Sequence, residues 1–287
     1  MPCPSLSRLL LLLATTVISI HAQTVQRDIP FAQAGEHDLA LDLYLPESPA
    51  KGVIVWVHGG AWRGGSKAGV DLRDMTEQGW ALASVDYRLS GDAPFPAQIH
   101  DIKAAIRFLR ASAGTLQIPT TPFVISGSSA GGHLAAEVGV TNGHPDLEGT
   151  VGDHLEQDSS VQAIVDLFGA SNFMTILKQS TPHGLNVRKP ALDLFITGQP
   201  EDVPEIAKLA SPVFHVDAND PPLYLSHGDQ DPQMPINQAH EMHGAYKAHG
   251  LPVHFEVMHG SAHGGPAFSS PEERARIDAF LTEHLEL

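Results

Sequence analysis

One stretch of the sequence constrains the fold more than any other, because it predicts a strand, a sharp turn and a helix in immediate succession. Residues 123–128 form an apolar run, residues 127–131 read Gly-Ser-Ser-Ala-Gly, and a helix-like pattern follows. Glycines flank Ser129 in this G-x-S-x-G pattern because the strained backbone of such a turn leaves no room for side chains. The hydroxyl of Ser129 is therefore expected at the tip of the turn.

The rest of the chain alternates apolar segments with amphipathic ones. Leucine at every second position over 39–45 predicts a half-buried strand, and the unbroken apolar run 52–57 predicts a strand buried on both faces. Further strands are expected at 80–85, 161–168, 222–226 and 253–257, and helices at 71–78, 94–109, 130–140, 236–249 and 271–285. This alternation predicts one α/β domain over 23–287, with a mostly parallel sheet and helices on both faces.

Ser129 needs partners, because a serine hydroxyl is a weak nucleophile without a base, an acid that orients the base, and N–H donors for a developing oxyanion. The glycine-rich loop 58–62 follows a central strand, where unshielded N–H groups suit such donors, although the same residues taken alone also fit a plain tight turn. Asp231 and His263 each follow a later strand. The chain order serine, aspartate, histidine is that of the α/β-hydrolases, so the sequence predicts the α/β-hydrolase fold.

Two neighbouring residues compete for these roles. Asp229 also follows the strand, but aspartates in turns commonly accept hydrogen bonds from backbone N–H groups, whereas Pro232 fixes the backbone beside Asp231. His259 lies four residues before His263, a spacing that zinc sites use on a helix. The glycines after each histidine would break that helix and the adjacent glutamate is missing, so no metal site is expected. His259 is interpreted as a residue that orders its loop.

Three other polar residues near strand ends are interpreted as structural. His58 is expected to fix its own loop through a hydrogen bond. Arg88 and Asp101 are expected to form an ion pair that sets the geometry of a neighbouring turn.

These motifs resemble those of exported carbohydrate esterases of the feruloyl and acetyl-xylan type, which are close to hormone-sensitive-lipase-like carboxylesterases. The resemblance runs from about Leu39 to the C-terminus and rests on segments 58–62, 86–89, 93–96, 127–132, 227–231 and 263–264. It implies that Ser129 is the nucleophile, Asp231 the acid and His263 the base.

The resemblance also assigns the oxyanion donors, which would be the backbone N–H groups of Gly60, Ala61 and Ala130. The chain departs from the family pattern at Ala262, where a glycine is expected, and at Met234, where a valine is expected.

The segment 170–211 is long and irregular for a simple connection, with four prolines and scattered apolar residues. It is expected to be a lid-like insertion, or alternatively a loosely packed insertion with no role at the site. Trp62, beside the glycine-rich loop, is expected to bind substrate and to favour short acyl groups.

The N-terminal residues resemble a secretory signal. Arg8 supplies the positive start, residues 9–20 an apolar core too short to span a bilayer stably, and residues 20–22 a passable cleavage site. Residues 1–22 are therefore expected to be a signal peptide of a secreted or periplasmic protein, the alternative being an anchor that stays uncut. The only cysteine, Cys3, lies in this segment, so the mature chain would have no disulfide or thiol nucleophile.

Charge and motifs together define the expected function. The formal net charge of −16 argues against nucleic acid or an anionic membrane as a partner. The sequence predicts a secreted serine esterase that needs no cofactor and acts on short-chain or carbohydrate-linked esters, whether small or attached to a polysaccharide. An amidase or peptidase would use the same residues, and a binding protein with an inactive site is the alternative outside enzymes.

Overall fold

The computed structural model describes residues 24–287, so the predicted signal segment 1–22 lies outside the described residues. The described chain forms an eight-stranded sheet in the order β1-β2-β4-β3-β5-β6-β7-β8. The strands are β1 (Thr24–Ala34), β2 (His37–Leu45), β3 (Val53–Val57), β4 (Ala81–Val85), β5 (Phe123–Ser128), β6 (Ala163–Leu167), β7 (Leu223–Gly228) and β8 (Val253–Met258). β1 and β2 pair antiparallel, as do β2 and β4, and all other neighbours are parallel.

Both faces of the sheet are buried, as the unbroken apolar strands predict. Along β3, Val53, Val55 and Val57 belong to one hydrophobic cluster, whereas Ile54 and Trp56 belong to a second cluster on the opposite face. All five side chains are fully buried. Because side chains alternate between the faces of a strand, each face of β3 needs a covering layer.

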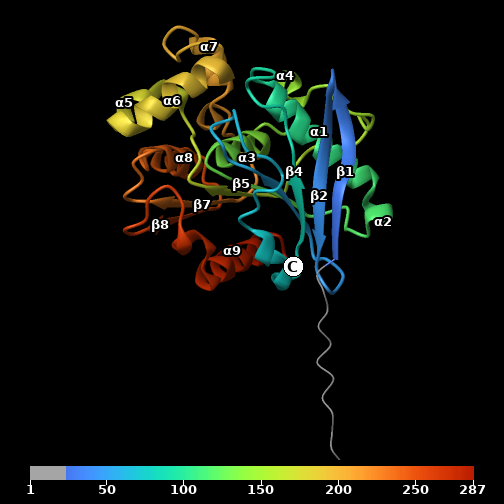
Figure 1. The fold of residues 1–287 in the computed structure, drawn as a ribbon. Coiled ribbons are helices and arrows are strands. Elements are labelled where there is room, and N and C mark those ends of the chain that lie inside the picture. Colours follow the sequence, from blue (N-terminus) through green and yellow to red (C-terminus); the bar gives the residue numbers. More distant parts are fainter. Residues whose placement is uncertain (1–23) are drawn as a thin grey trace, which may run out of the picture.

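Helices supply these two layers (Figure 1). α1 (Ala97–Ala111), α3 (Ala130–Val140) and α8 (Asn237–Ala248) contribute to the first cluster, and α9 (Pro271–His284) and the 3₁₀ helix η1 (Arg73–Gln78) contribute to the second. The short elements are α2 (Ala113–Leu116), α4 (Pro145–Glu148), η2 (Pro212–Phe214) and η3 (Pro266–Ser269). The predicted α/β architecture, a mostly parallel sheet between helical layers, is confirmed.

The structure differs from the sequence-based expectation in the segment 170–211, which is helical where an irregular path was expected. It contains α5 (Phe173–Gln179), α6 (Pro182–Phe195) and α7 (Pro204–Leu209). Pro182 and Pro204 stand at the first turns of α6 and α7, where proline's missing N–H costs nothing and its fixed φ favours the helix. These prolines therefore start helices within the insertion.

One strand has no counterpart in the sequence-based expectation. β1 lies at the edge of the sheet beside β2, and its burial pattern is mostly exposed or half-buried with no regular alternation. An edge strand that packs one side weakly carries little hydrophobic periodicity, so the pattern does not reveal it. Over residues 24–287, no helix combines the length and apolar character that crossing a membrane requires.

Candidate active site

Ser129 occupies the sharp turn between β5 and α3, with φ 57° and ψ −118°. The backbone there is held by hydrogen bonds from Ser129 N–H to Leu167 O (2.9 Å) and from His133 N–H to Ser129 O (3.0 Å). A Cβ on Gly127 would lie 2.3 Å from the carbonyl oxygen of Gly131. The flanking glycines are thus required by a backbone approach that no other residue permits.

His263 and Asp231 lie beside Ser129, each in the loop that follows its own strand. His263 Nε2 is 2.8 Å from Ser129 Oγ, and His263 Nδ1 is 2.6 Å from Asp231 Oδ2. The imidazole packs edge-on against Phe168, with ring centroids 4.9 Å apart. The structure therefore brings the three predicted side chains into one hydrogen-bonded chain, although they are 32 or more residues apart in sequence.

The carboxylate of Asp231 is fully buried, yet it is held in its charged form. Burial raises the pKa of Asp231, but hydrogen bonds from His227, His263 and the backbone N–H of Met234 outweigh burial and hold this pKa well below its usual range. Asp231 Oδ1 also accepts a hydrogen bond from the N–H of Gln233 at 2.8 Å. An ionised Asp231 requires the His263 proton on Nδ1, which leaves Nε2 free to accept from Ser129.

His227 is a site residue to which the sequence assigned no role. Its side chain is fully buried; Nε2 donates to Met234 O at 3.0 Å and lies 3.5 Å from Asp231 Oδ2. It thereby holds the loop that carries the carboxylate. The signal was present in the motif His-Gly-Asp-Gln-Asp, but a histidine at a strand end has several interpretations without the fold.

The glycine-rich turn after β3 lies next to Ser129. Gly60, Ala61 and Trp62 all have positive φ, of 117°, 53° and 60°, and Arg63 N–H donates to Gly60 O at 3.1 Å. Within residues 24–287, no acceptor is hydrogen-bonded to the backbone N–H of Gly60, Ala61 or Ala130. These three residues, which carry the predicted oxyanion donors, border space beside Ser129.

Trp62 is mostly a core residue, with only 1% of its surface exposed. Its Nε1 donates to His133 Nδ1 at 3.1 Å, and its ring stacks on Phe195 with centroids 4.8 Å apart. Trp62 also lines the narrow space beside Ser129. Its expected role in binding substrate stays a prediction.

Two further sequence interpretations concern loop residues near the site. His259 Nδ1 lies 2.9 Å from Asp229 Oδ2, and Gly260 N–H donates to Asp229 Oδ1 at 2.8 Å, so this pair orders the loop after β8. His58 Nδ1 bonds Gly59 O at 2.8 Å. These contacts match the expected loop-fixing roles.

The expected ion pair between Arg88 and Asp101 is present. It is bidentate, with N–O distances of 2.8 and 2.7 Å, and the carboxylate also accepts the backbone N–H of Arg88. Across the described part of the chain, no three His, Cys, Asp or Glu side chains group closely enough to hold a metal ion.

A cavity of about 750 Å³, the serine cavity, opens over Ser129 and His263 and is walled by Gly60, Phe168 and Phe268. A second cavity of about 870 Å³, the outer cavity, adjoins it through two shared wall residues, Asp71 and Ser269.

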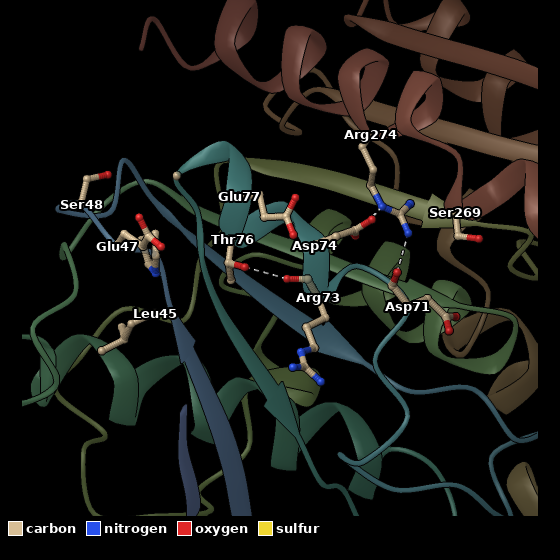
Figure 2. A pocket seen from close by; sticks show the side chains of 12 residues that line it. Leu45, Glu47, Ser48, Asp71, Arg73, Asp74, Thr76, Glu77, Ser269 and Arg274 are labelled. Carbon is tan, nitrogen blue, oxygen red and sulfur yellow. Dashed lines mark hydrogen bonds and ion pairs between the residues drawn. The ribbon is translucent and has the colours of Figure 1, made fainter. Parts of the chain in front are cut away.

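The lining of the outer cavity is polar (Figure 2). Most of its lining residues have hydroxyl, carboxylate or guanidinium side chains, among them Glu47, Ser48, Asp71, Arg73, Asp74, Thr76, Glu77 and Ser269. Figure 2 shows Arg274 bonded to the side chain of Asp74 and to the backbone of Asp71. The distance from Arg274 Nε to Asp74 Oδ1 is 2.6 Å. Arg274 also donates to Phe268 O at 2.6 Å. It therefore links the segment that contains Asp71 to η3, and these two segments supply the wall residues that the two cavities share.

Comparison with known proteins identifies the family. The family model described as BD-FAE matches residues 41–246 of the chain. The chain belongs to the BD-FAE family. Because the chain shares its overall structure with solved esterases, among them a carbohydrate esterase, the predicted α/β-hydrolase fold and the resemblance to carbohydrate esterases are confirmed.

This BD-FAE chain is similar to several esterases. It is 32% identical over 198 residues to Esterase LipC of Mycobacterium tuberculosis. The aligned region covers 68% of this chain and 48% of Esterase LipC. The chain spans about half the length of the curated relatives that it matches first.

Two solved structures cover nearly the whole of the BD-FAE chain. A truncated form of a carbohydrate esterase from gut microbiota has a TM-score of 0.83 and 31% identity, covering 92% of this chain and 97% of that one. Thermogutta terrifontis esterase 2 phosphonylated by sarin has a TM-score of 0.74 and 26% identity, covering 91% and 94%.

Proposed function

We propose that this chain is a serine esterase that hydrolyses carboxylic esters through an acyl-enzyme on Ser129. The observation that carries the proposal is the hydrogen-bonded chain from Ser129 Oγ through His263 to the charged carboxylate of Asp231. This arrangement is the one by which a serine hydroxyl becomes a nucleophile at neutral pH. The similarity to esterases, including Esterase LipC and a carbohydrate esterase, supports the same reaction class.

The proposed mechanism assigns each group one task. His263 Nε2 takes the proton as Ser129 Oγ attacks the ester carbonyl, and Asp231 stabilises the resulting imidazolium in the correct orientation. His263 then gives the proton to the leaving alcohol. The second half repeats these steps with water as the nucleophile, which releases the acid and restores Ser129.

The oxyanion formed in each half of this reaction has a place to bind. The backbone N–H groups of Gly60, Ala61 and Ala130 are free and border the space beside Ser129. Such donors are most effective because their orientation is fixed before the charge develops.

We further propose that the acyl group is short and that the alcohol part is large and polar, as in a carbohydrate-linked ester. On the side of Ser129 towards α6, the space of about 10 Å³ bounded by Ala61, Trp62, Ala130 and Val187 takes no more than about one atom, so a long acyl chain has no room there. On the side of His263, the serine cavity continues into the hydroxyl- and carboxylate-lined outer cavity. Neutral sugars offer many hydroxyl donors to such a surface, whereas an anionic chain would meet more carboxylates than guanidinium groups, since the outer cavity is lined by four acidic residues (Glu47, Asp71, Asp74 and Glu77) and two arginines (Arg73 and Arg274).

A substrate panel tests the proposal. It contains 4-nitrophenyl esters of rising acyl length, acetylated xylan, methyl ferulate and an aminoacyl anilide, with Ser129→Ala as the control. Fast turnover of acetyl esters, acetylated xylan among them, is expected, together with covalent labelling of Ser129 by a fluorophosphonate. Cleavage of the anilide faster than of the esters would show that the protein is an amidase. Absence of both turnover and labelling would favour the alternative of a binding protein with an inactive site.

We also propose export, with removal of residues 1–22. The support is the charged start and apolar core of this segment and the lack of cysteine after it. N-terminal sequencing of the protein recovered from a bacterial periplasm or medium tests the cleavage, and a membrane-bound product with its N-terminus intact would argue for an uncut anchor.

A further inference from the structure

Arg188 is a buried cation in the middle of α6, the longest helix of the insertion. Arg188 is only 3% exposed, and its Nη2 donates to the backbone oxygen of Gln233. A second contact joins the same two segments, since Thr181 Oγ1 donates to Pro232 O. The insertion is therefore docked on the loop that carries Asp231, and it brings a guanidinium with it.

The hydrogen bonds of this guanidinium are incomplete. Nε of Arg188 is buried and has no partner among the described residues. Burial lowers the pKa of Arg188 to about 10, against the opposing effect of Asp231, so the group remains charged at neutral pH. A buried charged donor without an acceptor is costly, which makes such a group a candidate for binding something that arrives during function.

The space that Arg188 borders contains the reacting group. Arg188, Ser129, Ala61 and Ala130 line the same narrow space of about 10 Å³. This volume is about that of one water-sized probe, so an oxygen atom placed there lies close to every wall. Two of the walls, Ala61 and Ala130, are residues whose free N–H groups we assign to the oxyanion.

We propose that the guanidinium of Arg188 supplies positive charge to the oxyanion that forms beside Ser129. The inference rests on the proposed esterase function. As the bond from Ser129 Oγ to the carbonyl carbon forms, the proton moves to His263 Nε2 and the carbonyl π electrons move onto oxygen. Collapse re-forms the carbonyl bond and expels the alcohol, which takes the proton back from His263. Arg188 gains and loses no proton, and acts on the charge alone.

Asp231 balances Arg188 in the resting enzyme, because its carboxylate lies near enough to raise the pKa of the guanidinium. That carboxylate contacts His263 at Nδ1, whereas Ser129 Oγ lies at Nε2 of the same ring. Arg188 borders the space beside Ser129 directly, so negative charge that forms on the substrate there adds a second partner for the guanidinium.

Three variants separate charge from packing. Arg188→Met removes the charge and keeps an unbranched side chain, Arg188→Gln removes the charge and keeps an amide donor for Gln233 O, and Arg188→Lys keeps the charge. Thr181→Val is the matched control, since it breaks the other contact between α6 and the Asp231 loop, together with the N-cap bond that Thr181 Oγ1 accepts from Gly184 N–H, without changing charge. Circular dichroism and melting temperature establish that each variant is folded before kinetics are measured.

Two measurements are made on each folded variant: kcat and KM for 4-nitrophenyl acetate, and Ki for phenylboronic acid, whose tetrahedral serine adduct is anionic. In the Met and Gln variants we expect kcat to fall by about tenfold to a thousandfold with little change in KM; the upper part of this range, about a hundredfold to a thousandfold, is that for loss of one oxyanion donor. Their boronate affinity should weaken in parallel. Arg188→Lys should retain more activity than either, and Thr181→Val should change kcat by less than about threefold.

Specific outcomes overturn the inference. A kcat within about twofold of wild type in the uncharged variants would do so, as would a kcat loss with unchanged boronate affinity. Equal losses in Thr181→Val and Arg188→Met would show that Arg188 acts only by positioning the Asp231 loop. A wild-type protein with neither turnover nor fluorophosphonate labelling would instead refute the esterase proposal itself.

Discussion

Replacing Asp231 by asparagine tests the site most sharply, because the surrounding hydrogen bonds dictate how the new amide must sit. Asp231 Oδ1 accepts from the N–H groups of Gln233 and Met234, both at 2.8 Å, and only an oxygen can accept these bonds. The amide NH₂ then takes the place of Oδ2, which lies 2.6 Å from His263 Nδ1. A donor at that place forces Nδ1 to become the acceptor and moves the imidazole proton to Nε2.

The consequence for catalysis follows from the second hydrogen bond of the imidazole. Nε2 lies 2.8 Å from Ser129 Oγ, and a protonated Nε2 cannot take the serine proton. We expect Asp231→Asn to lower kcat by up to about ten-thousand-fold, the effect of a wrong tautomer in such triads. KM should change little, because the carboxylate is fully buried behind His263 and does not reach the serine cavity.

The assay is release of 4-nitrophenol from 4-nitrophenyl acetate, with the melting temperature measured in parallel. Asp229→Asn is the matched control, since Asp229 bonds the exposed His259 and the backbone of Gly260 on the neighbouring loop. It should cost at most about tenfold through loosened loop geometry. The reasoning fails if Asp229→Asn is the more damaging change, or if Asp231→Asn retains more than about a tenth of kcat.

Three other predictions concern the turn and the core. Ser129→Ala should reduce ester hydrolysis by several orders of magnitude and abolish fluorophosphonate labelling with little change in melting temperature. A larger loss of activity in Ser128→Ala would show that Ser129 is not the nucleophile. Gly131→Ala should lower the free energy of unfolding, measured in urea, by about 3 kcal/mol or more, because the new Cβ would lie 2.0 Å from a backbone oxygen of β3. Gly114 has open space around it, so Gly114→Ala should not lower this free energy. Burial raises the pKa of Asp166 to about 7. Between about pH 4 and pH 7 the folded chain therefore keeps a proton on Asp166 that the same carboxyl releases in the unfolded chain, and the stability of the fold decreases as pH rises through this range. Asp166→Asn should remove that decline in melting temperature, and an unchanged pH slope would contradict the assignment.

The sequence by itself determined the features that depend on local backbone requirements. The apolar runs 52–57 and 123–128 revealed strands buried on both faces, because such strands leave no place for polar side chains. The glycines around Ser129 revealed the turn, because a Cβ there meets backbone within a few residues along the chain or in the adjacent strand. Asp231 and His263 could be chosen because parallel strands deliver their carboxyl ends to one edge of the sheet.

Only the tertiary structure decided the features that depend on contacts between distant segments. The prolines of the insertion suggested an irregular path, but Pro182 and Pro204 stand at the starts of α6 and α7, and α6 accommodates Pro190 in its interior. Trp62 is conspicuous beside a glycine-rich loop, yet His133 and Phe195 enclose it in the core. Arg188 carries no motif at all, and its place beside Ser129 results from the docking of α6 on the loop after β7. Sequence patterns indicate the backbone conformation of an element and which of its faces is buried. Which buried surfaces contact one another depends on three-dimensional packing, and this packing determines the walls and the charge around Ser129.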